Sequence, residues 1–240
     1  MAERILDLAQ DPEVELAQLA DAIAVDPAIT AKVLRIANSP LYSRQRKSSN
    51  LRQALGLLGL NAAVTLALSF SLAETLVGNQ RRALDIEHLW KRSLLAATCA
   101  RELGRTRLRS HIEELFLSAL LHNVGMLSLD RLQPDLYADA GDLQYDGAAI
   151  AAFEQRQIGS DHASVGSWLL RNWGLPEPLC DAVEHKLAVA GDHGDADAVT
   201  FRRCVANAVS IAELWLTSEP EDSAVRAVMD RLEATLAMDE

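Results

Sequence analysis

The sequence predicts an all-α protein, and three observations support this fold class. Alanine and leucine are abundant whereas β-branched and aromatic residues are sparse, which favours helix over strand. The pairs Asp11-Pro12 and Asp26-Pro27 can each begin a helix, because aspartate caps free amides and proline fits the first turn. No segment alternates convincingly between apolar and polar residues, as a half-buried strand would. We therefore expect a multi-helix bundle.

The first part of the chain is expected to contain four helices, at about 12–24, 27–38, 50–58 and 61–77. A fifth helix is expected from a capping residue, Asp85, to Gly104, where glycine stops it. Its apolar face is predicted to contain Ile86, Trp90, Ser93, Leu94 and Ala97.

Further helices are expected in the second half of the chain. The segment "SHIE" has the spacing of a capping box, with Ser110 as the cap and Glu113 three residues later. The helix that it begins should end at His122-Asn123. From Pro134 to 147 the chain is rich in aspartate and glycine and is expected to be irregular. Later helices are expected at about 148–157, 161–173, 177–188 and 196–217.

The segment "GNQRRALD" (78–85) is the best candidate for a boundary, since a glycine ends one helix and an aspartate can cap the next. We expect an N-terminal helical part, 1–84, packed on a helical core, 85–217. Residues 218–240 are expected to form an acidic C-terminal helix or tail. The length of 240 residues allows these parts to be integrated into one domain.

The formal net charge of -11 argues against nucleic acid and membrane surfaces as partners, because both are anionic. The basic stretch "RELGRTRLR" (101–109) is interpreted as solvated loop charge. The 3 cysteines are scattered without a CxxC pair, which suggests a reducing compartment. The first residues include acids and no apolar run, unlike a signal peptide, so a cytoplasmic location is expected.

One uncharged stretch, between Arg52 and Glu74, is long enough to span a membrane. It contains several polar residues, and Gly59-Leu60-Asn61 is typical of a break between two helices. We therefore interpret this stretch as a buried core segment.

Two histidines and an aspartate could share a pocket. His162 follows Asp161 at a predicted helix start, where the pair can equally be a capping cluster. His185 belongs to the next predicted helix, which a tight Gly-Leu-Pro turn joins to the first. The turn could bring Asp161, His162 and His185 together.

Five segments, in this order, resemble the HDOD domain family over about residues 5–215. They are "VDPAITAKVLRIANSPLYS" (25–43), "SSNLRQALGLLGLNAAVTLALS" (48–69), "LWKRSLLAATCARELG" (89–104), "LFLSALLHNVGML" (115–127) and "DHASVGSWLLRNWGLPEPLCDAVEHK" (161–186). The resemblance implies an all-helical fold related to the HD superfamily of metal-dependent phosphohydrolases. It also implies a role in bacterial signal transduction.

The resemblance implies a degenerate metal site. HD enzymes bind divalent cations with a histidine, an adjacent His-Asp pair and a distant aspartate, and the metal polarises phosphate and activates water. The corresponding residues here are Arg92, His122, Asn123 and Asn207. A guanidinium has no lone pair, and an amide is a neutral, weaker ligand. We therefore expect no metal, no other cofactor and no catalytic residue.

Three functions remain open at this point. The first is a non-catalytic regulatory domain of HDOD type that acts by protein–protein interaction with an unidentified signalling protein. The second is a residual metal-dependent phosphohydrolase or phosphodiesterase, with His122 and further ligands such as Asp161, His162 or His185. The third is a sensor that binds a small anion or nucleotide at Arg92 without turnover. In structural terms, His122 could instead bond to backbone and Asn123 could cap a helix C-terminus.

Overall fold

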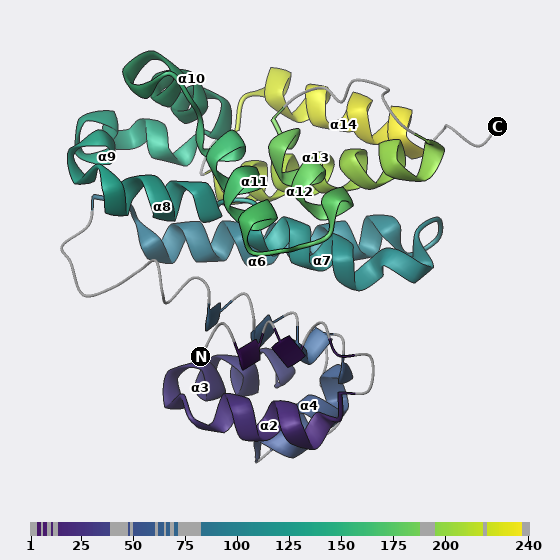
Figure 1. Cartoon of the computed structure of the whole chain (residues 1–240). Coiled ribbons are helices and arrows are strands. Elements are labelled where there is room, and N and C mark those ends of the chain that lie inside the picture. The colour runs from purple at the N-terminus through teal and green to yellow at the C-terminus, as the bar shows by residue number, and fades with distance from the viewer. Residues whose placement is uncertain are drawn as a thin grey trace. The chain divides into compact units, whose positions relative to one another are not determined.

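The computed structural model describes residues 4–5, 7–8, 11, 14–38, 48, 50–60, 62–64, 66–67, 70–71, 83–187, 195–217 and 220–236. Across these residues the regular structure is helical and contains no strand (Figure 1), which confirms the all-α fold class. The chain divides into two compact units, residues 1–78 and 79–240, and each is described by itself.

The first unit contains α2 (Leu16–Ala24), α3 (Pro27–Ala37) and α4 (Leu51–Leu58), which pack against one another. The Asp26 carboxylate accepts a hydrogen bond from the amide of Ile29 at 3.2 Å, so α3 begins as predicted. The predicted start of α2 is wrong. The helix begins at Leu16, where Glu15 and Gln18 form a capping box, and not after Asp11, the cap that was predicted. The helix expected at 61–77 falls partly outside the described residues.

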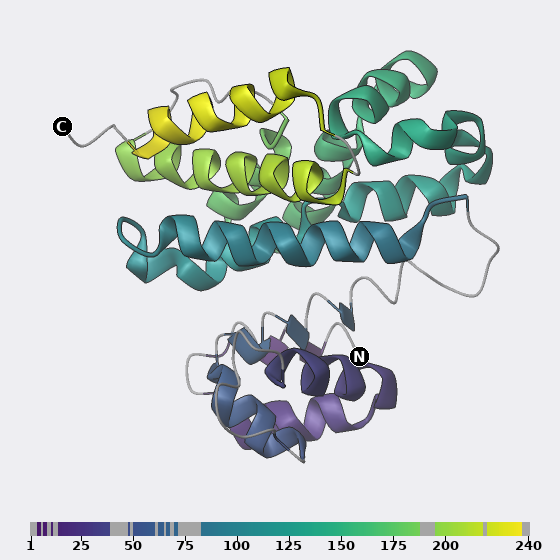
Figure 2. The ribbon, with the colours of Figure 1, turned by 180° about the vertical axis from the view of Figure 1, so that it is seen from behind.

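The second unit is built around three packed helices, α6 (Ile86–Gly104), α7 (Ile112–Leu121) and α13 (Ala196–Leu216). Asp85 caps α6 by accepting a hydrogen bond from the amide of His88 at 2.9 Å. The C-terminal helix α14 (Asp222–Leu236) lies along α13, as Figure 2 shows from behind.

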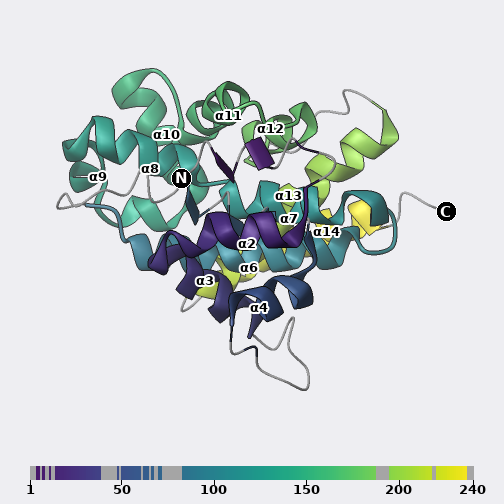
Figure 3. The ribbon, with the colours of Figure 1, turned by 60° about the horizontal axis from the view of Figure 1, so that its bottom comes forward.

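Five shorter helices complete this unit: α8 (Val124–Leu132), α9 (Pro134–Ala140), α10 (Gly147–Ile158), α11 (His162–Asn172) and α12 (Glu177–Glu184). Figures 1 and 3 both place α8, α9 and α10 at the same end of the unit. Helix α11 packs on α8, and α12 contacts α7, α11 and α13. Short 3-10 turns, Arg109–His111 and Gly141–Tyr145, precede α7 and α10.

Three expectations about this unit are wrong. Ser110 is not a helix cap, because it lies within a 3-10 turn and α7 starts after His111. Residues Pro134–Ala140 form a helix rather than a loop, since Leu136, Tyr137 and Ala140 form a buried face behind the initiating proline. Helix α12 ends at Glu184, earlier than expected.

The buried face of α6 also differs from the predicted one. Leu94 is 39% exposed, whereas Arg92 is almost fully buried. The prediction placed only uncharged residues on this face, so it did not place an arginine there. The buried residues are Leu89, Arg92, Ser93, Ala96, Ala97, Ala100 and Gly104.

The basic stretch 101–109 is solvated only in part, because Arg105 and Arg109 are exposed whereas Arg101 and Arg107 are half-buried. Arg101 lies in α6 and pairs with Glu113 of α7 at 2.9 Å. Arg107 donates a hydrogen bond to the carbonyl oxygen of Thr235 in α14. These arginines therefore connect helices within the second unit.

One stretch of the described residues, Arg109–Leu132, is long and apolar enough to cross a membrane, but 78% of its most apolar window is buried within the structure. It comprises α7 and α8 in the core of the second unit, which accounts for its hydrophobicity. The stretch between Arg52 and Glu74 lies partly outside the described residues.

Helices α8 and α11 approach closely where two glycines face each other. A Cβ atom added at Gly125 would lie 1.9 Å from the carbonyl oxygen of His162 and 2.7 Å from the amide nitrogen of Gly166. Both contacts are with backbone, which cannot rotate away as a side chain could. This contact places the start of α11 directly against the start of α8.

Replacing Gly125 by alanine should therefore destabilise the second unit by about 2–3 kcal/mol, because the two helices must separate. Gly56, in α4, is a matched control, since nothing lies within 4 Å of an added Cβ there. Gly56→Ala should stabilise its helix by about 0.5–1 kcal/mol. Thermal unfolding measures the stability of both variants. Equal changes in stability for Gly125→Ala and Gly56→Ala would contradict the close contact at Gly125.

Candidate functional site

A buried polar cluster lies where the helices of the second unit meet. We define it as Arg92, His122, Asn123, Glu154, His162, Lys186 and Glu213. Six of the seven residues are at most 3% exposed, and the Glu213 side chain is 25% exposed. They come from α6, the α7–α8 junction, α10, α11, the segment after α12, and α13. Charged groups are rarely buried to this extent unless neighbouring groups compensate their charge or bind them by hydrogen bonds.

His122 follows the last residue of α7, and its side chain bonds to backbone. Its Nδ1 lies 2.6 Å from the carbonyl oxygen of Ala119, which can only accept, so Nδ1 carries the hydrogen. Nε2 then keeps its lone pair, and it has no hydrogen-bond partner among the described residues. Burial, and then the charges of Lys186 and Arg92, hold the pKa of His122 well below its ordinary value. The imidazole is therefore neutral.

Asn123 is bound by a lysine from a distant segment. The Lys186 ammonium donates to the Asn123 Oδ1 at 3.0 Å and to the His122 carbonyl oxygen at 2.6 Å. Asn123 immediately precedes α8 and makes no side-chain capping bond there. Its side chain thus serves the contact with Lys186.

The amino group of Lys186 is buried beside a second cation. Burial and the charge of Arg92 lower its pKa to about 7, while the nearby carboxylates of Glu213 and Glu154 act in the opposite direction. Nothing in the sequence singled out this residue, because a lysine after a helix ordinarily has a solvated side chain.

Arg92 reaches the cluster from the inner face of α6. Its guanidinium lies 3.4 Å from the Glu213 carboxylate, 3.5 Å from the Tyr145 carbonyl oxygen and 3.4 Å from the Met126 sulfur. Burial lowers the pKa of Arg92, opposed by Glu213, yet a guanidinium stays charged in proteins. The Glu213 carboxylate thus occupies the place beside Arg92 that a small anion would take in the sensor hypothesis. Burial raises the pKa of Glu213, because it disfavours the charged carboxylate.

His162 begins α11 and is held by a buried glutamate. The Glu154 carboxylate accepts hydrogen bonds from the His162 backbone amide and Nδ1, both at 2.7 Å, and from the Tyr137 hydroxyl at 2.6 Å. Burial alone would raise the pKa of Glu154, but these bonds outweigh it and lower the pKa. Burial lowers the pKa of His162 to about 4 despite the glutamate. This imidazole is also neutral, and its Nε2 has no partner within the described part of the chain.

Other residues predicted for the site lie elsewhere. The Asn207 amide donates to the Thr235 hydroxyl at 2.8 Å, so this side chain joins α13 to α14. Asp161 caps α11 by accepting from the amide of Ser164 at 2.8 Å. His185 is 43% exposed and pairs with Asp181. Of the three residues expected to share a pocket, only His162 places its side chain in the cluster.

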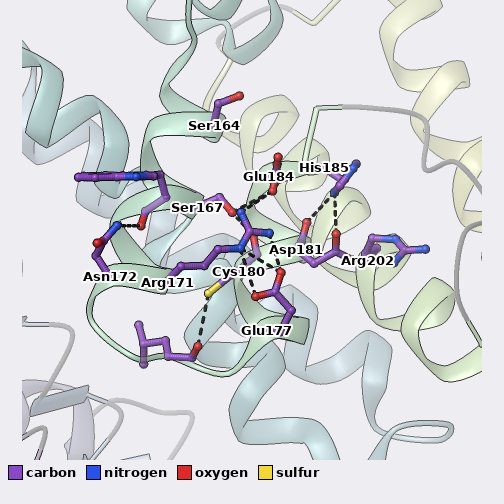
Figure 4. A network of polar contacts seen from close by, with 12 residues as sticks. Ser164, Ser167, Arg171, Asn172, Glu177, Cys180, Asp181, Glu184, His185 and Arg202 are labelled. Carbon is purple, nitrogen blue, oxygen red and sulfur yellow. Dashed lines mark hydrogen bonds and ion pairs between the residues drawn. The ribbon is translucent and has the colours of Figure 1, made fainter.

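A network of polar contacts joins α11 to α12 (Figure 4). Lys186 follows α12 in the chain. Arg171 of α11 pairs with Glu177 and Glu184 of α12 at 2.7 and 2.8 Å. The Ser167 hydroxyl lies 2.8 Å from the Cys180 carbonyl oxygen. These contacts make the position of the lysine depend on the packing of α11 against α12.

The cluster does not fit a divalent metal ion. Two imidazole lone pairs are free, but the neighbouring groups include a guanidinium, an ammonium and a neutral amide. Within the described ranges, no group of three or more His, Cys, Asp or Glu side chains is placed to hold a metal. The donor set therefore departs from that of a metal-dependent phosphohydrolase.

The sequence profile of the HDOD domain matches residues 1–189 of the chain. The chain belongs to the HDOD domain family. The crystal structure of an HDOD domain protein with unknown function from Geobacter sulfurreducens is similar, with a TM-score of 0.76 and 24% identity, covering 100% of this chain and 83% of that chain. The response regulator MmoQ from Methylococcus capsulatus is 30% identical, with a TM-score of 0.54, covering 96% and 90%.

An uncharacterized protein of Treponema pallidum is 24% identical over 177 residues, which are 72% of this chain and 34% of that protein. The chain thus spans about a third of the length of this relative.

The pair of Arg92 and Glu213 gives a first prediction about the site. Arg92→Met should destabilise the protein by about 3 kcal/mol, because it leaves a partly buried carboxylate without its cation. The double variant Arg92→Met/Glu213→Gln should recover much of this loss, since the remaining amide is neutral. Arg171→Met, at a half-exposed ion pair, should cost less than about 1 kcal/mol. Urea unfolding measures all three, and a double variant no better than Arg92→Met would contradict the pairing.

His162 predicts a pH dependence. Between pH 6.5 and 4 the unfolded chain binds a proton at this histidine, whereas the folded chain does not. Stability should therefore fall as the pH decreases through this window, by on the order of 3 kcal/mol from this group. His162→Gln should show a smaller decrease, measured by chemical denaturation at pH 7 and 4.5. Identical pH profiles for the wild type and His162→Gln would refute the assignment.

Proposed function

We propose that this chain is a non-catalytic regulatory domain of bacterial signal transduction, which acts in the cytoplasm by binding another protein. The observation that carries this proposal is the buried guanidinium of Arg92, which is 1% exposed and pairs with Glu213. According to the family resemblance, Arg92 occupies the position of the first metal ligand.

The charge of Arg92 opposes metal-assisted chemistry. A guanidinium cannot give up its proton at physiological pH and offers no lone pair. In an interior of low dielectric constant, its repulsion of a nearby divalent cation costs several kcal/mol. Asn123 adds to this effect, because an amide lacks the negative charge that would offset the cation. A site of this composition cannot readily generate the metal-bound hydroxide that hydrolyses a phosphodiester.

The two alternative functions have less support. A residual phosphohydrolase needs ligands besides His122, and His185 lies outside the cluster. An anion sensor at Arg92 would have to displace Glu213 and the Tyr145 carbonyl from the guanidinium. The relative MmoQ is named a response regulator, which agrees with a signalling role for a domain of this kind.

Metal content and hydrolysis test the proposal together. Untagged protein should contain well below one equivalent of iron, manganese or zinc by plasma mass spectrometry. With each of these ions added, it should not hydrolyse bis(p-nitrophenyl) phosphate above the rate without protein. Crosslinking in the native cell should recover one protein in stoichiometric amount.

His122→Ala is the control for this experiment. Metal-dependent hydrolysis by the wild type that disappears in His122→Ala would overturn the proposal in favour of a residual hydrolase. Absence of a reproducible crosslinked protein would remove the support for partner binding.

A further inference from the structure

We propose that the amino group of Lys186 takes the place of a metal ion in the buried cluster and holds the α7–α8 junction to the end of α12, as a bound cation would. This inference rests on the proposed function in one respect, since both require that the wild-type cluster contains no metal. It adds that a particular side chain excludes the ion and performs its structural role.

The contacts of Lys186 are those of a cation at a ligand site. Its side chain comes from the segment after α12 and crosses to the turn between α7 and α8, where two oxygen atoms receive its hydrogens. These are the His122 carbonyl oxygen at 2.6 Å and the Asn123 Oδ1 at 3.0 Å. Lys186 is 3% exposed, so the link is made inside the protein.

The two histidines of the cluster are oriented as metal-ligating imidazoles usually are. Each uses Nδ1 for a hydrogen bond to an oxygen, a backbone carbonyl for His122 and a carboxylate for His162. Such outer contacts fix the tautomer and leave Nε2 as the ligand atom. Both Nε2 atoms are buried without a partner among the described residues. The cluster therefore retains part of a ligand set.

The charges of the cluster balance without an added ion. With Lys186 protonated and both histidines neutral, the positive charges of Arg92 and Lys186 offset the negative charges of Glu154 and Glu213. A divalent ion would leave an excess of two positive charges in a buried site, which is costly. Removing the lysine charge and adding one carboxylate would reverse this, leaving two negative charges for a divalent ion to neutralise.

A pair of variants separates the lysine from the carboxylate. Asn123→Asp restores an acidic ligand but keeps Lys186, which can pair with it. Asn123→Asp/Lys186→Ala has the same carboxylate without the amino group. We expect the double variant to bind one equivalent of Co²⁺, with visible absorption bands of a histidine-ligated ion, at least about a hundredfold more tightly than Asn123→Asp. Adding His122→Ala or His162→Ala should abolish this binding.

A second measurement covers the case in which the double variant does not fold. Lys186→Ala alone should have a lower Tm than the wild type, and propylammonium should raise that Tm by replacing the missing amino group. Lys91, whose side chain is 59% exposed, is the matched control. Lys91→Ala should have an almost unchanged Tm and no response to propylammonium.

The outcomes distinguish this inference from the proposed function. Tight Co²⁺ binding by the wild type, at one equivalent, would overturn both. A wild type that binds no Co²⁺, with a folded double variant that also binds none, would overturn the role of Lys186 alone. Equal Co²⁺ affinities of Asn123→Asp and the double variant would do the same, as would a Tm of Lys186→Ala equal to that of the wild type.

Discussion

The second unit depends on the mutual compensation of charges that are buried where its helices converge. Arg92, Lys186, Glu154 and Glu213 come from four different parts of the chain, and each would be costly to bury alone. Their packing is therefore interdependent, because the displacement of any one helix would leave another helix with an uncompensated charge. The neutral imidazoles of His122 and His162 fit this arrangement, since burial and then the nearby cations oppose their protonation.

Close packing makes this compensation possible. The absence of side chains at Gly125 and Gly166 lets the starts of α8 and α11 meet, which brings His162 toward the turn that carries His122. Polar contacts between α11 and α12 then fix the segment from which Lys186 enters. Backbone geometry at two glycines thus determines which polar side chains can reach each other.

The sequence predicted much of the fold and less of the site. Helix starts were predictable where a capping residue acts locally, as at Asp26 and Asp85, because the signal and the structure lie within one turn. Ser110 shows the limit, since a 3-10 turn can use the same residues. Arg92, His122 and Asn123 were identified through family resemblance. Lys186, Glu154 and Glu213 were not, because a charged residue is ordinarily solvated and only contacts across helices reveal that it is buried. Asn207 was also identified through the family resemblance, but its side chain forms the α13–α14 contact instead.

The pairing of Arg92 with Glu213 joins residues that are 121 positions apart in the chain. Contacts of such long range form late, because a large loop must close before they contribute. During synthesis, Arg92 leaves the ribosome long before the carboxylate that neutralises it, and until then its charge favours hydration over a compact interior. The second unit should therefore acquire its native packing only after α13 has emerged, as a cooperative event. The long-range pairing of Arg92 with Glu213 would in this way delay premature collapse of the nascent chain.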